Sequence, residues 1–132
     1  MHKMRFSWCE GVGVRCQGGN QDNPDWFEID FRLERARVHS GVVDLTLVDA
    51  NEIGPQCLQV ICDRPGFVLM LGECDGAEYR VRSFTNANAA FGQVEIMGNY
   101  WDARLVCADF AIVKSVLREF FDTGNVSREV LN

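Results

Sequence analysis

Hydrophobic and polar residues alternate with a period of two in several short segments in the middle of the chain. Residues 43–47 alternate in this way, and the same pattern recurs over residues 57–63 and 78–84. This period is typical of β-strands that bury one face. Residues 67–71 are instead apolar throughout, as expected for a central strand that is covered on both faces.

Glycine-containing dipeptides between these segments predict tight turns. Asp75-Gly76 and Gly98-Asn99 both favour short β-hairpins. The last predicted strand covers residues 100–107, where apolar and polar side chains alternate again. Strands joined by tight turns must be antiparallel neighbours. The sequence therefore predicts an antiparallel meander of about five to seven strands.

Apolar residues near the C-terminus recur at three- and four-residue spacing, which predicts an amphipathic helix. Asp109 is a favourable N-cap for this helix, and Gly124 supplies the left-handed residue that commonly ends a helix. The apolar positions are Phe110, Val113, Val116, Leu117, Phe120 and Phe121. Because this face needs an apolar partner, we expect the helix to lie across one side of the sheet in an α+β domain.

Residues 25–38 carry two conflicting signals. Asp22-Asn23-Pro24 resembles a helix start, with proline inside the first turn. Yet apolar residues from Phe27 to Leu33 alternate strictly with charged ones, which is a strand pattern, and on a helical wheel they form two apolar sectors. We favour an N-terminal helix and keep a strand as the alternative. The Gly-rich residues 9–20 are expected to form an edge strand and a mobile loop.

Length and composition indicate one globular domain that spans residues 1–132. No run of eighteen apolar residues occurs and no apolar stretch follows the charged N-terminus, so we expect a soluble, cytoplasmic protein that does not insert in a membrane. The six cysteines form no C-x-x-C pair, and His2 and His39 are the only histidines, so we expect reduced thiols, no metal site and no cofactor.

Negative charge is concentrated in one part of the chain. The net charge is −6, and residues 38–79 alone contain seven acidic residues against one basic residue. Such a surface repels nucleic-acid phosphates but attracts a basic protein, so we expect no direct nucleic-acid binding and a protein partner. The candidate contact residues at the predicted turns are Asp49, Glu52, Glu73, Asp75, Glu78 and Tyr79.

Motifs for catalysis are absent from the sequence. The glycines near residue 11 do not complete a dinucleotide-binding fingerprint, and neither a phosphate-binding loop nor a Gly-x-Ser-x-Gly nucleophile elbow occurs. Carboxylates at turn tips are solvated, which is a poor setting for acid–base catalysis. We expect a protein without enzymatic activity. The alternatives are a small ligand-binding module or a hydrolase that uses Asp102 or Glu95 with Arg104.

Four segments of the chain resemble immunity proteins of bacterial polymorphic toxin systems, which include contact-dependent growth inhibition. The segments are Asp22-Asn23-Pro24-Asp25-Trp26, Gly54-Pro55 followed by Leu58 and Val60, Asn99-Tyr100-Trp101-Asp102-Ala103, and Asp109 through Phe120-Phe121-x-Thr123-Gly124. The resemblance implies a small cytoplasmic antitoxin that is a monomer or weak dimer alone. It would bind and neutralise the C-terminal domain of a cognate toxin, often a nuclease, by covering a basic active-site cleft.

Overall fold

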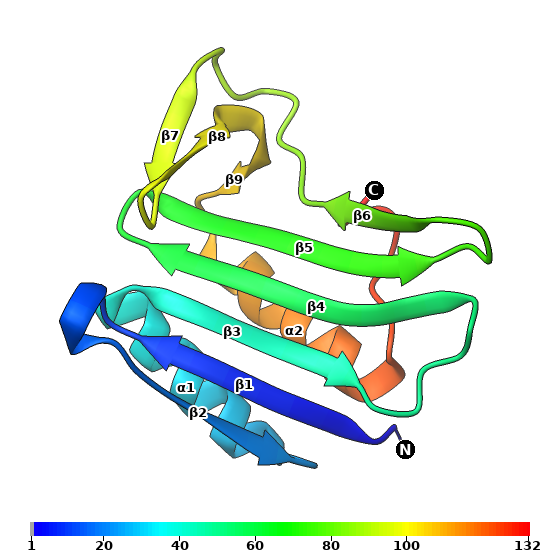
Figure 1. Cartoon of the computed structure of the whole chain (residues 1–132). Coiled ribbons are helices and arrows are strands. Elements are labelled where there is room, and N and C mark those ends of the chain that lie inside the picture. Colours follow the sequence, from blue (N-terminus) through cyan, green and yellow to red (C-terminus); the bar gives the residue numbers. More distant parts are fainter. Residues whose placement is uncertain (1) are drawn as a thin grey trace.

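The computed structural model describes residues 2–132, which form one antiparallel sheet, two helices and a small separate hairpin (Figure 1). The strands are β1 (Met4–Glu10), β2 (Gln17–Asp22), β3 (Gly41–Leu47), β4 (Gly54–Asp63), β5 (Gly66–Cys74), β6 (Tyr79–Ser83), β7 (Gln93–Ile96), β8 (Asn99–Asp102) and β9 (Val106–Cys107). The helices are α1 (Trp26–His39) and α2 (Phe110–Thr123), and 3₁₀ turns cover Gly13–Arg15 and Ala103–Leu105.

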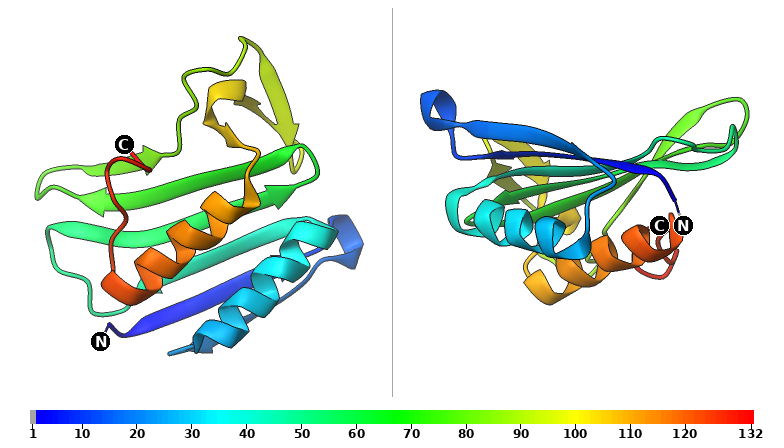
Figure 2. Two further views of the ribbon diagram at one scale, coloured as in Figure 1. Left: turned by 180° about the vertical axis from the view of Figure 1, so that it is seen from behind. Right: turned by 90° about the horizontal axis from the view of Figure 1, so that it is seen from below.

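The main sheet has the strand order β2-β1-β3-β4-β5-β6, and β9 adds to β5. Both helices lie on one face of this sheet, and Figure 2 shows them side by side with the opposite face uncovered over most strands. The α+β class, the antiparallel sheet and the two helices predicted from the sequence are confirmed. The chain crosses from edge strand β2 to β3 through α1, so that β3 pairs with β1.

The core lies between the helices and the sheet, where alternate strand residues align in register. Phe6, Leu45, Leu58 and Leu71 pair successively across β1, β3, β4 and β5, and all four are fully buried. The apolar side of α2 packs on this layer, including the fully buried Phe120. Burial of such side chains stabilises the fold by roughly 1.5–3 kcal/mol each.

Residues 26–39 form a helix, and the strand alternative is wrong. The Asp25 carboxylate caps α1 by accepting a hydrogen bond of 2.8 Å from the Glu28 backbone N–H. Ile29 and Leu33 are buried against the sheet, whereas Phe27 and Phe31 lie on the exposed side of the helix. The strict alternation in the sequence therefore arises from two apolar sides of one helix.

Helix α2 begins and ends where the sequence predicts. The Asp109 carboxylate accepts a hydrogen bond of 2.9 Å from the Ala111 backbone N–H. Gly124 ends the helix in the left-handed conformation, with φ of 76°. Among residues 2–132, neither α2 nor any other helix is long and apolar enough to cross a membrane.

The strand predicted over residues 100–107 is interrupted in the structure. The chain leaves β8 at Asp102, whose carboxylate accepts a hydrogen bond from the Arg104 backbone N–H and starts a 3₁₀ turn. Only the two residues of β9 return to the main sheet, while β7 and β8 form a separate hairpin. The capping carboxylate explains the break, because it competes with strand hydrogen bonding.

The expectation that all six cysteines are reduced is also wrong, because Cys9 and Cys16 form a disulfide. The Gly-rich residues 9–20 contribute to both strands of the β1–β2 hairpin, where the sequence predicted one edge strand. The hairpin brings the ends of its connecting loop together and so places the two thiols within bonding distance. The remaining cysteines, Cys57, Cys62, Cys74 and Cys107, are free.

Candidate functional site

Two acidic connections lie side by side at one end of the sheet. The β3–β4 loop (residues 48–53) and the β5–β6 connection (residues 75–78) meet there because Gly54, at the start of β4, pairs with Cys74, at the end of β5 (Figure 1). A Cβ placed on Gly76 would lie 3.5 Å from Cδ1 of Ile53. The Ile53 side chain therefore joins the two connections into one continuous surface.

The β5–β6 connection is organised by the Asp75 carboxylate. Its Oδ1 accepts hydrogen bonds from the backbone N–H groups of Ala77, at 3.0 Å, and Glu78, at 2.8 Å. These bonds and the neighbouring Arg80 guanidinium, whose Nε lies 2.9 Å from Oδ2, lower the pKa of Asp75. Arg80 also lies 3.3 Å from the Glu78 carboxylate. The capped turn has four residues between its strands, two more than the Asp75-Gly76 signal predicts.

The β3–β4 loop presents its two carboxylates without compensating cations. Asp49 and Glu52 are exposed, and neither forms an ion pair with any group among residues 2–132. A hollow of about 200 Å³ lies between this loop and the C-terminal end of α2, and Asp49, Asn51 and Asn125 contribute to its lining. The C-terminal end of a helix carries partial negative charge, which adds to the charge of Asp49.

Exposed apolar side chains surround these acids. Val48 is 57% exposed, Ile53 66%, Tyr79 59% and Val81 54%. The Tyr79 ring crosses Gly72 on β5, since a Cβ at Gly72 would collide with the phenol, and partial burial raises the pKa of Tyr79. We define the acidic end as residues 48–53 and 75–78 together with Tyr79 and Val81.

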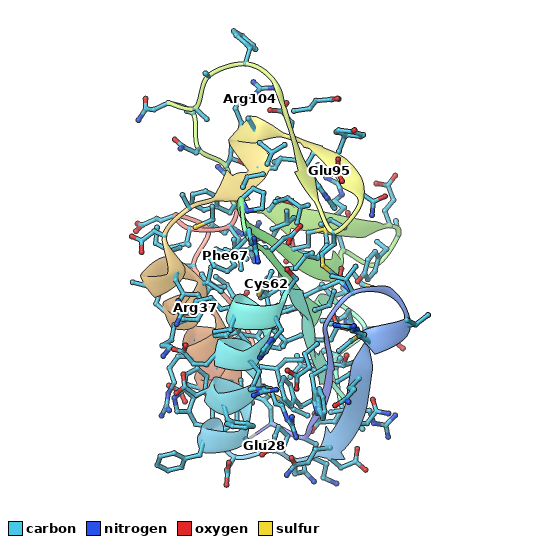
Figure 3. All side chains as sticks on the ribbon, turned by 90° about the vertical axis from the view of Figure 1, so that its left-hand side faces the viewer. Glu28, Arg37, Cys62, Phe67, Glu95 and Arg104 are labelled. Atoms are coloured by element: carbon cyan, nitrogen blue, oxygen red, sulfur yellow. A yellow bond between two sulfur atoms is a disulfide. The ribbon has the colours of Figure 1, made fainter. Side chains whose placement is uncertain are left out.

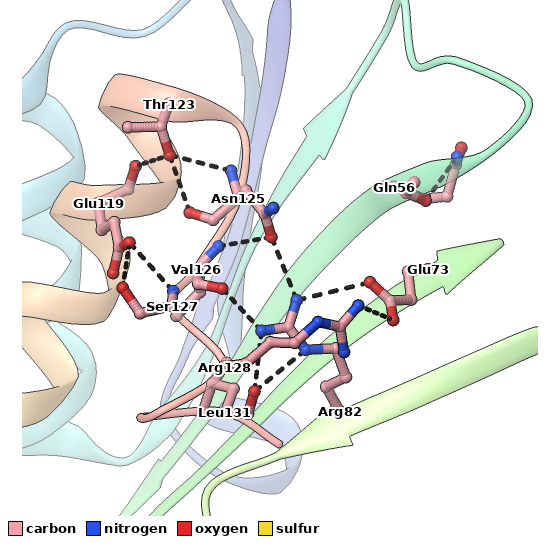
Figure 4. A network of polar contacts seen from close by, with 11 residues as sticks. Gln56, Glu73, Arg82, Glu119, Thr123, Asn125, Val126, Ser127, Arg128 and Leu131 are labelled. Carbon is pink, nitrogen blue, oxygen red and sulfur yellow. Dashed lines mark hydrogen bonds and ion pairs between the residues drawn. The ribbon is translucent and has the colours of Figure 1, made fainter. Parts of the chain in front are cut away.

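Glu73 lies apart from this surface, on the helix-bearing side of the sheet. Its side chain is only 15% exposed and contacts two arginines, Arg82 at 3.5 Å and Arg128 at 3.1 Å (Figure 4). Arg82 in turn donates to Asn125 and to the Val126 carbonyl. Of the six candidate contact residues, the structure thus brings five together, and it assigns Glu73 to a network that holds the C-terminal segment.

Sequence reasoning did not anticipate the two arginines that balance these acids. Arg80 and Arg82 stand on β6, immediately after the acidic segment 38–79. That segment has seven acidic residues and one basic residue, and Arg80 and Arg82, the first basic residues downstream, form ion pairs with three of its acids, Glu73, Asp75 and Glu78. That charge imbalance was the available signal.

The carboxylates considered for hydrolysis lie on or beside the β7–β8 hairpin (Figure 3). Asp102 and Arg104 form an exposed ion pair with 2.7 Å between Oδ2 and Nη2. Hydrogen bonds from the Arg104 side chain and backbone lower the pKa of Asp102 to about 2. A carboxyl group that is fully ionised at neutral pH cannot act there as a general acid. No cluster of three potential metal ligands occurs among residues 2–132.

Comparisons with known proteins provide a family and a fold. Residues 7–130 match DUF6911, a family of unknown function. A crystal structure of a hypothetical protein from Neisseria gonorrhoeae superposes with a TM-score of 0.76 at 13% sequence identity, over 95% of this chain and 91% of that chain. At this identity the likeness shows the fold alone. No curated protein matches the chain.

Proposed function

The chain belongs to DUF6911, a family of unknown function, and we propose that it is an immunity protein of a bacterial polymorphic toxin system of the contact-dependent growth inhibition type. In this proposal it acts in the cytoplasm and is not an enzyme. It binds the C-terminal domain of a cognate toxin, a nuclease, and covers the basic cleft that holds the nucleic-acid substrate.

The observation that carries this proposal is the position of the Ile53 side chain next to Gly76, which brings two acidic connections into one surface. That surface has exposed apolar side chains among carboxylates, as protein interfaces combine apolar anchors with a polar rim. Tyrosine is enriched among the residues that dominate binding energy, and Tyr79 is 59% exposed here. The resemblance of four sequence segments to immunity proteins adds independent support.

The acidic end suits a basic cleft for electrostatic and steric reasons. A nuclease needs positive charge to hold phosphates, so carboxylates at the mouth of its cleft replace the charge of the substrate. Exposed charges such as Asp49 mainly accelerate association, while buried anchors slow dissociation. A bound domain of this size also blocks the cleft physically.

The first test uses the genomic neighbourhood. The proposal expects an upstream reading frame that encodes a large secreted protein with a variable C-terminal domain. Co-expression of this chain should rescue cells from that domain, and calorimetry should detect a one-to-one complex of the purified proteins. A toxic neighbouring domain that neither binds this chain nor is neutralised by it would overturn the proposal.

Matched variants locate the contact surface. Tyr79→Ala should weaken binding to that domain by tenfold or more, about 1.4 kcal/mol, whereas Tyr100→Ala removes a similarly exposed tyrosine from β8 and should have no effect. Asp49→Lys should slow association and reduce its salt dependence, while Glu95→Lys on β7 should not. If Tyr79→Ala and Tyr100→Ala weakened binding equally, and Asp49→Lys and Glu95→Lys slowed association equally, the acidic end would be excluded as the contact surface.

A second candidate function is supported by a separate hollow. About 550 Å³ of space lies between the N-terminal residues and the end of α2, bordered by Lys3, Pro24 and Phe121 among others. This volume is within the range of small-molecule sites. A ligand-binding module would show a raised melting temperature with a metabolite, and Phe121→Asp would abolish that shift without affecting toxin binding.

A further inference from the structure

Helix α1 has a second apolar stripe that faces away from the sheet. Phe27 is 84% exposed, Phe31 51% and Val38 63%. At 100° per residue these three positions fall within about 40° of one another. The buried residues of α1, including Ile29 and Ala36, lie on the opposite side.

No element of the described chain covers this stripe. Figure 2 shows α1 on the outside of the molecule with α2 beside it. Lys114 of α2 reaches α1 beside the stripe, where Nζ lies 2.9 Å from Asp30 and 3.1 Å from Glu34. Two exposed phenylalanines in one helical row form an unpartnered apolar patch, and such patches mark interaction sites.

Charges on both sides of the stripe follow a self-complementary order. One flank carries Glu28 and, seven residues later, Arg35, while the other flank carries Asp30 and, seven residues later, Arg37. Between them stand Arg32 on the first flank, which pairs with Glu10 and Glu28, and Glu34 on the second, which pairs with Arg37 and Lys114. Each flank thus has its acid toward the start of α1 and its base toward the end. Figure 3 shows Glu28 and Arg37 near opposite ends of the helix.

These charges already have partners within the chain, such as Glu10 for Arg35 and Glu34 for Arg37. They nevertheless remain accessible to a second molecule. The exposed fractions of the side chains are 33% for Glu28, 35% for Asp30, 46% for Arg35 and 47% for Arg37.

From this arrangement we propose that α1 is the interface of a homodimer in which two copies of the helix pack antiparallel. A twofold axis perpendicular to the helices places each flank opposite the same flank of the partner. The acid of one copy then faces the base of the other, so Glu28 meets Arg35 and Asp30 meets Arg37. Phe27 of one copy lies opposite Val38 of the other, with both Phe31 rings near the axis. Parallel packing would instead set acids against acids.

The proposed dimer is weak and depends on concentration. Helix α1 has 14 residues and is about 21 Å long. A single pair of helices of this length falls at the low end of interface areas, below about 1,200 Å². The stripe shares no residue with the acidic end, and the dimer does not rest on the proposed function.

Sedimentation equilibrium tests the dimer directly. The chain mass is 14.9 kDa, and the average mass should rise toward twice this value as concentration increases to about 500 μM, the range in which a dimer of weak affinity becomes populated. Phe27→Asp should remain monomeric at all concentrations. Phe91→Asp is the matched control, because Phe91 is 95% exposed in a loop away from α1, and it should associate like the wild type.

A charge exchange tests the orientation of the helices. The variant Glu28→Arg/Asp30→Arg and the variant Arg35→Glu/Arg37→Glu should each be monomeric, since each places charges of one sign at all four of these flank positions. An equimolar mixture of the two should form a heterodimer. Circular dichroism confirms that each variant is folded. A wild type that stays at the monomer mass, a Phe27→Asp variant that still dimerises, or folded charge variants that fail to associate when mixed would each overturn the proposal.

Discussion

The guanidinium of Arg82 donates two hydrogen bonds to the carbonyl oxygen of Leu131, from Nε at 3.0 Å and from Nη2 at 2.8 Å. The two residues are 49 positions apart in the sequence. Arg82 is only 4% exposed and also donates to the Val126 carbonyl at 2.7 Å. A charged side chain thus ties the segment after α2 to edge strand β6, next to the core.

Replacement of Arg82 should therefore be costly. Arg82→Met leaves the buried carbonyls of Leu131 and Val126 and the Glu73 carboxylate without this donor, and we expect the free energy of unfolding to fall by about 3 kcal/mol. Urea denaturation followed by circular dichroism measures this change. Arg80→Met, two residues away and 64% exposed at its side chain, should cost at most about 1 kcal/mol. Similar losses for the two variants would contradict the buried network.

Asp63 should make stability dependent on pH. Burial tends to raise its pKa, but hydrogen bonds from the Met97 backbone N–H, the Ser40 hydroxyl and the Arg64 backbone N–H outweigh burial and lower it. A lowered pKa means that the folded state favours the carboxylate. Its stabilisation is present above the ordinary pKa and is lost as pH falls through the lowered value.

The corresponding variant is Asp63→Asn, which cannot ionise. We expect a loss of about 2 kcal/mol at pH 7, typical of hydrogen bonds to a charged group, and a smaller difference from wild type in acid. Chemical denaturation at a series of pH values measures both. Glu95→Gln is the control with an exposed carboxylate, and a pH-independent difference for Asp63→Asn would refute the assignment.

Asp44 should show the opposite sign. Burial raises its pKa, partly offset by a hydrogen bond with Gln59, and its Oδ1 is buried without a hydrogen-bond partner. The folded state therefore disfavours the carboxylate, and wild-type stability falls as pH rises from the ordinary pKa through the raised one. Asp44→Asn should be more stable than wild type at pH 7 by about 0.5–1 kcal/mol. The measurement is the free energy of unfolding of Asp44→Asn minus that of wild type, at pH 7 and in acid. A difference that is less favourable to the variant at pH 7 than in acid would contradict this prediction.

The Cys9–Cys16 disulfide should stabilise the β1–β2 hairpin. Its closed loop is short, and the chain-entropy estimate for such a loop is about 2.5 kcal/mol. Cys9→Ser/Cys16→Ser should lose about that much under oxidising conditions, and a reductant should abolish the difference from wild type. Cys57→Ser, which removes a free thiol, should not respond to the reductant. Mass spectrometry after alkylation of the wild type without reductant should show four labelled thiols. Labelling of all six cysteines would show that the Cys9–Cys16 disulfide does not form.

The sequence by itself determined the elements that depend on near neighbours. The C-terminal helix could be predicted because Asp109 caps it locally and Gly124 ends it. The N-terminal helix could be predicted from Asp22-Asn23-Pro24, but its cap is Asp25, so Pro24 precedes the helix and does not lie in its first turn. The β5–β6 and β7–β8 hairpins followed from glycine-containing turns and from the period of two in the strands, although the β7–β8 turn consists of Met97 and Gly98 and not of Gly98-Asn99. Each of these signals acts over a few residues, within the reach of a side chain and its adjacent backbone. The acidic residues of the β3–β4 and β5–β6 connections could be named for the same reason, because turns are exposed.

The tertiary structure alone decided which side each residue faces and which distant residues meet. Glu73 is an acid next to a predicted turn, yet pairing with Arg82 and Arg128, nine and 55 residues away, removes it from the surface. Phe27 and Phe31 alternate with charged residues as in a strand, yet they lie on the outside of a helix whose other side fills the core. The Cys9–Cys16 pairing likewise required the hairpin itself. These outcomes depend on sheet register and on the docking of helices, which are set by the combined burial of many side chains and are not encoded in any short segment.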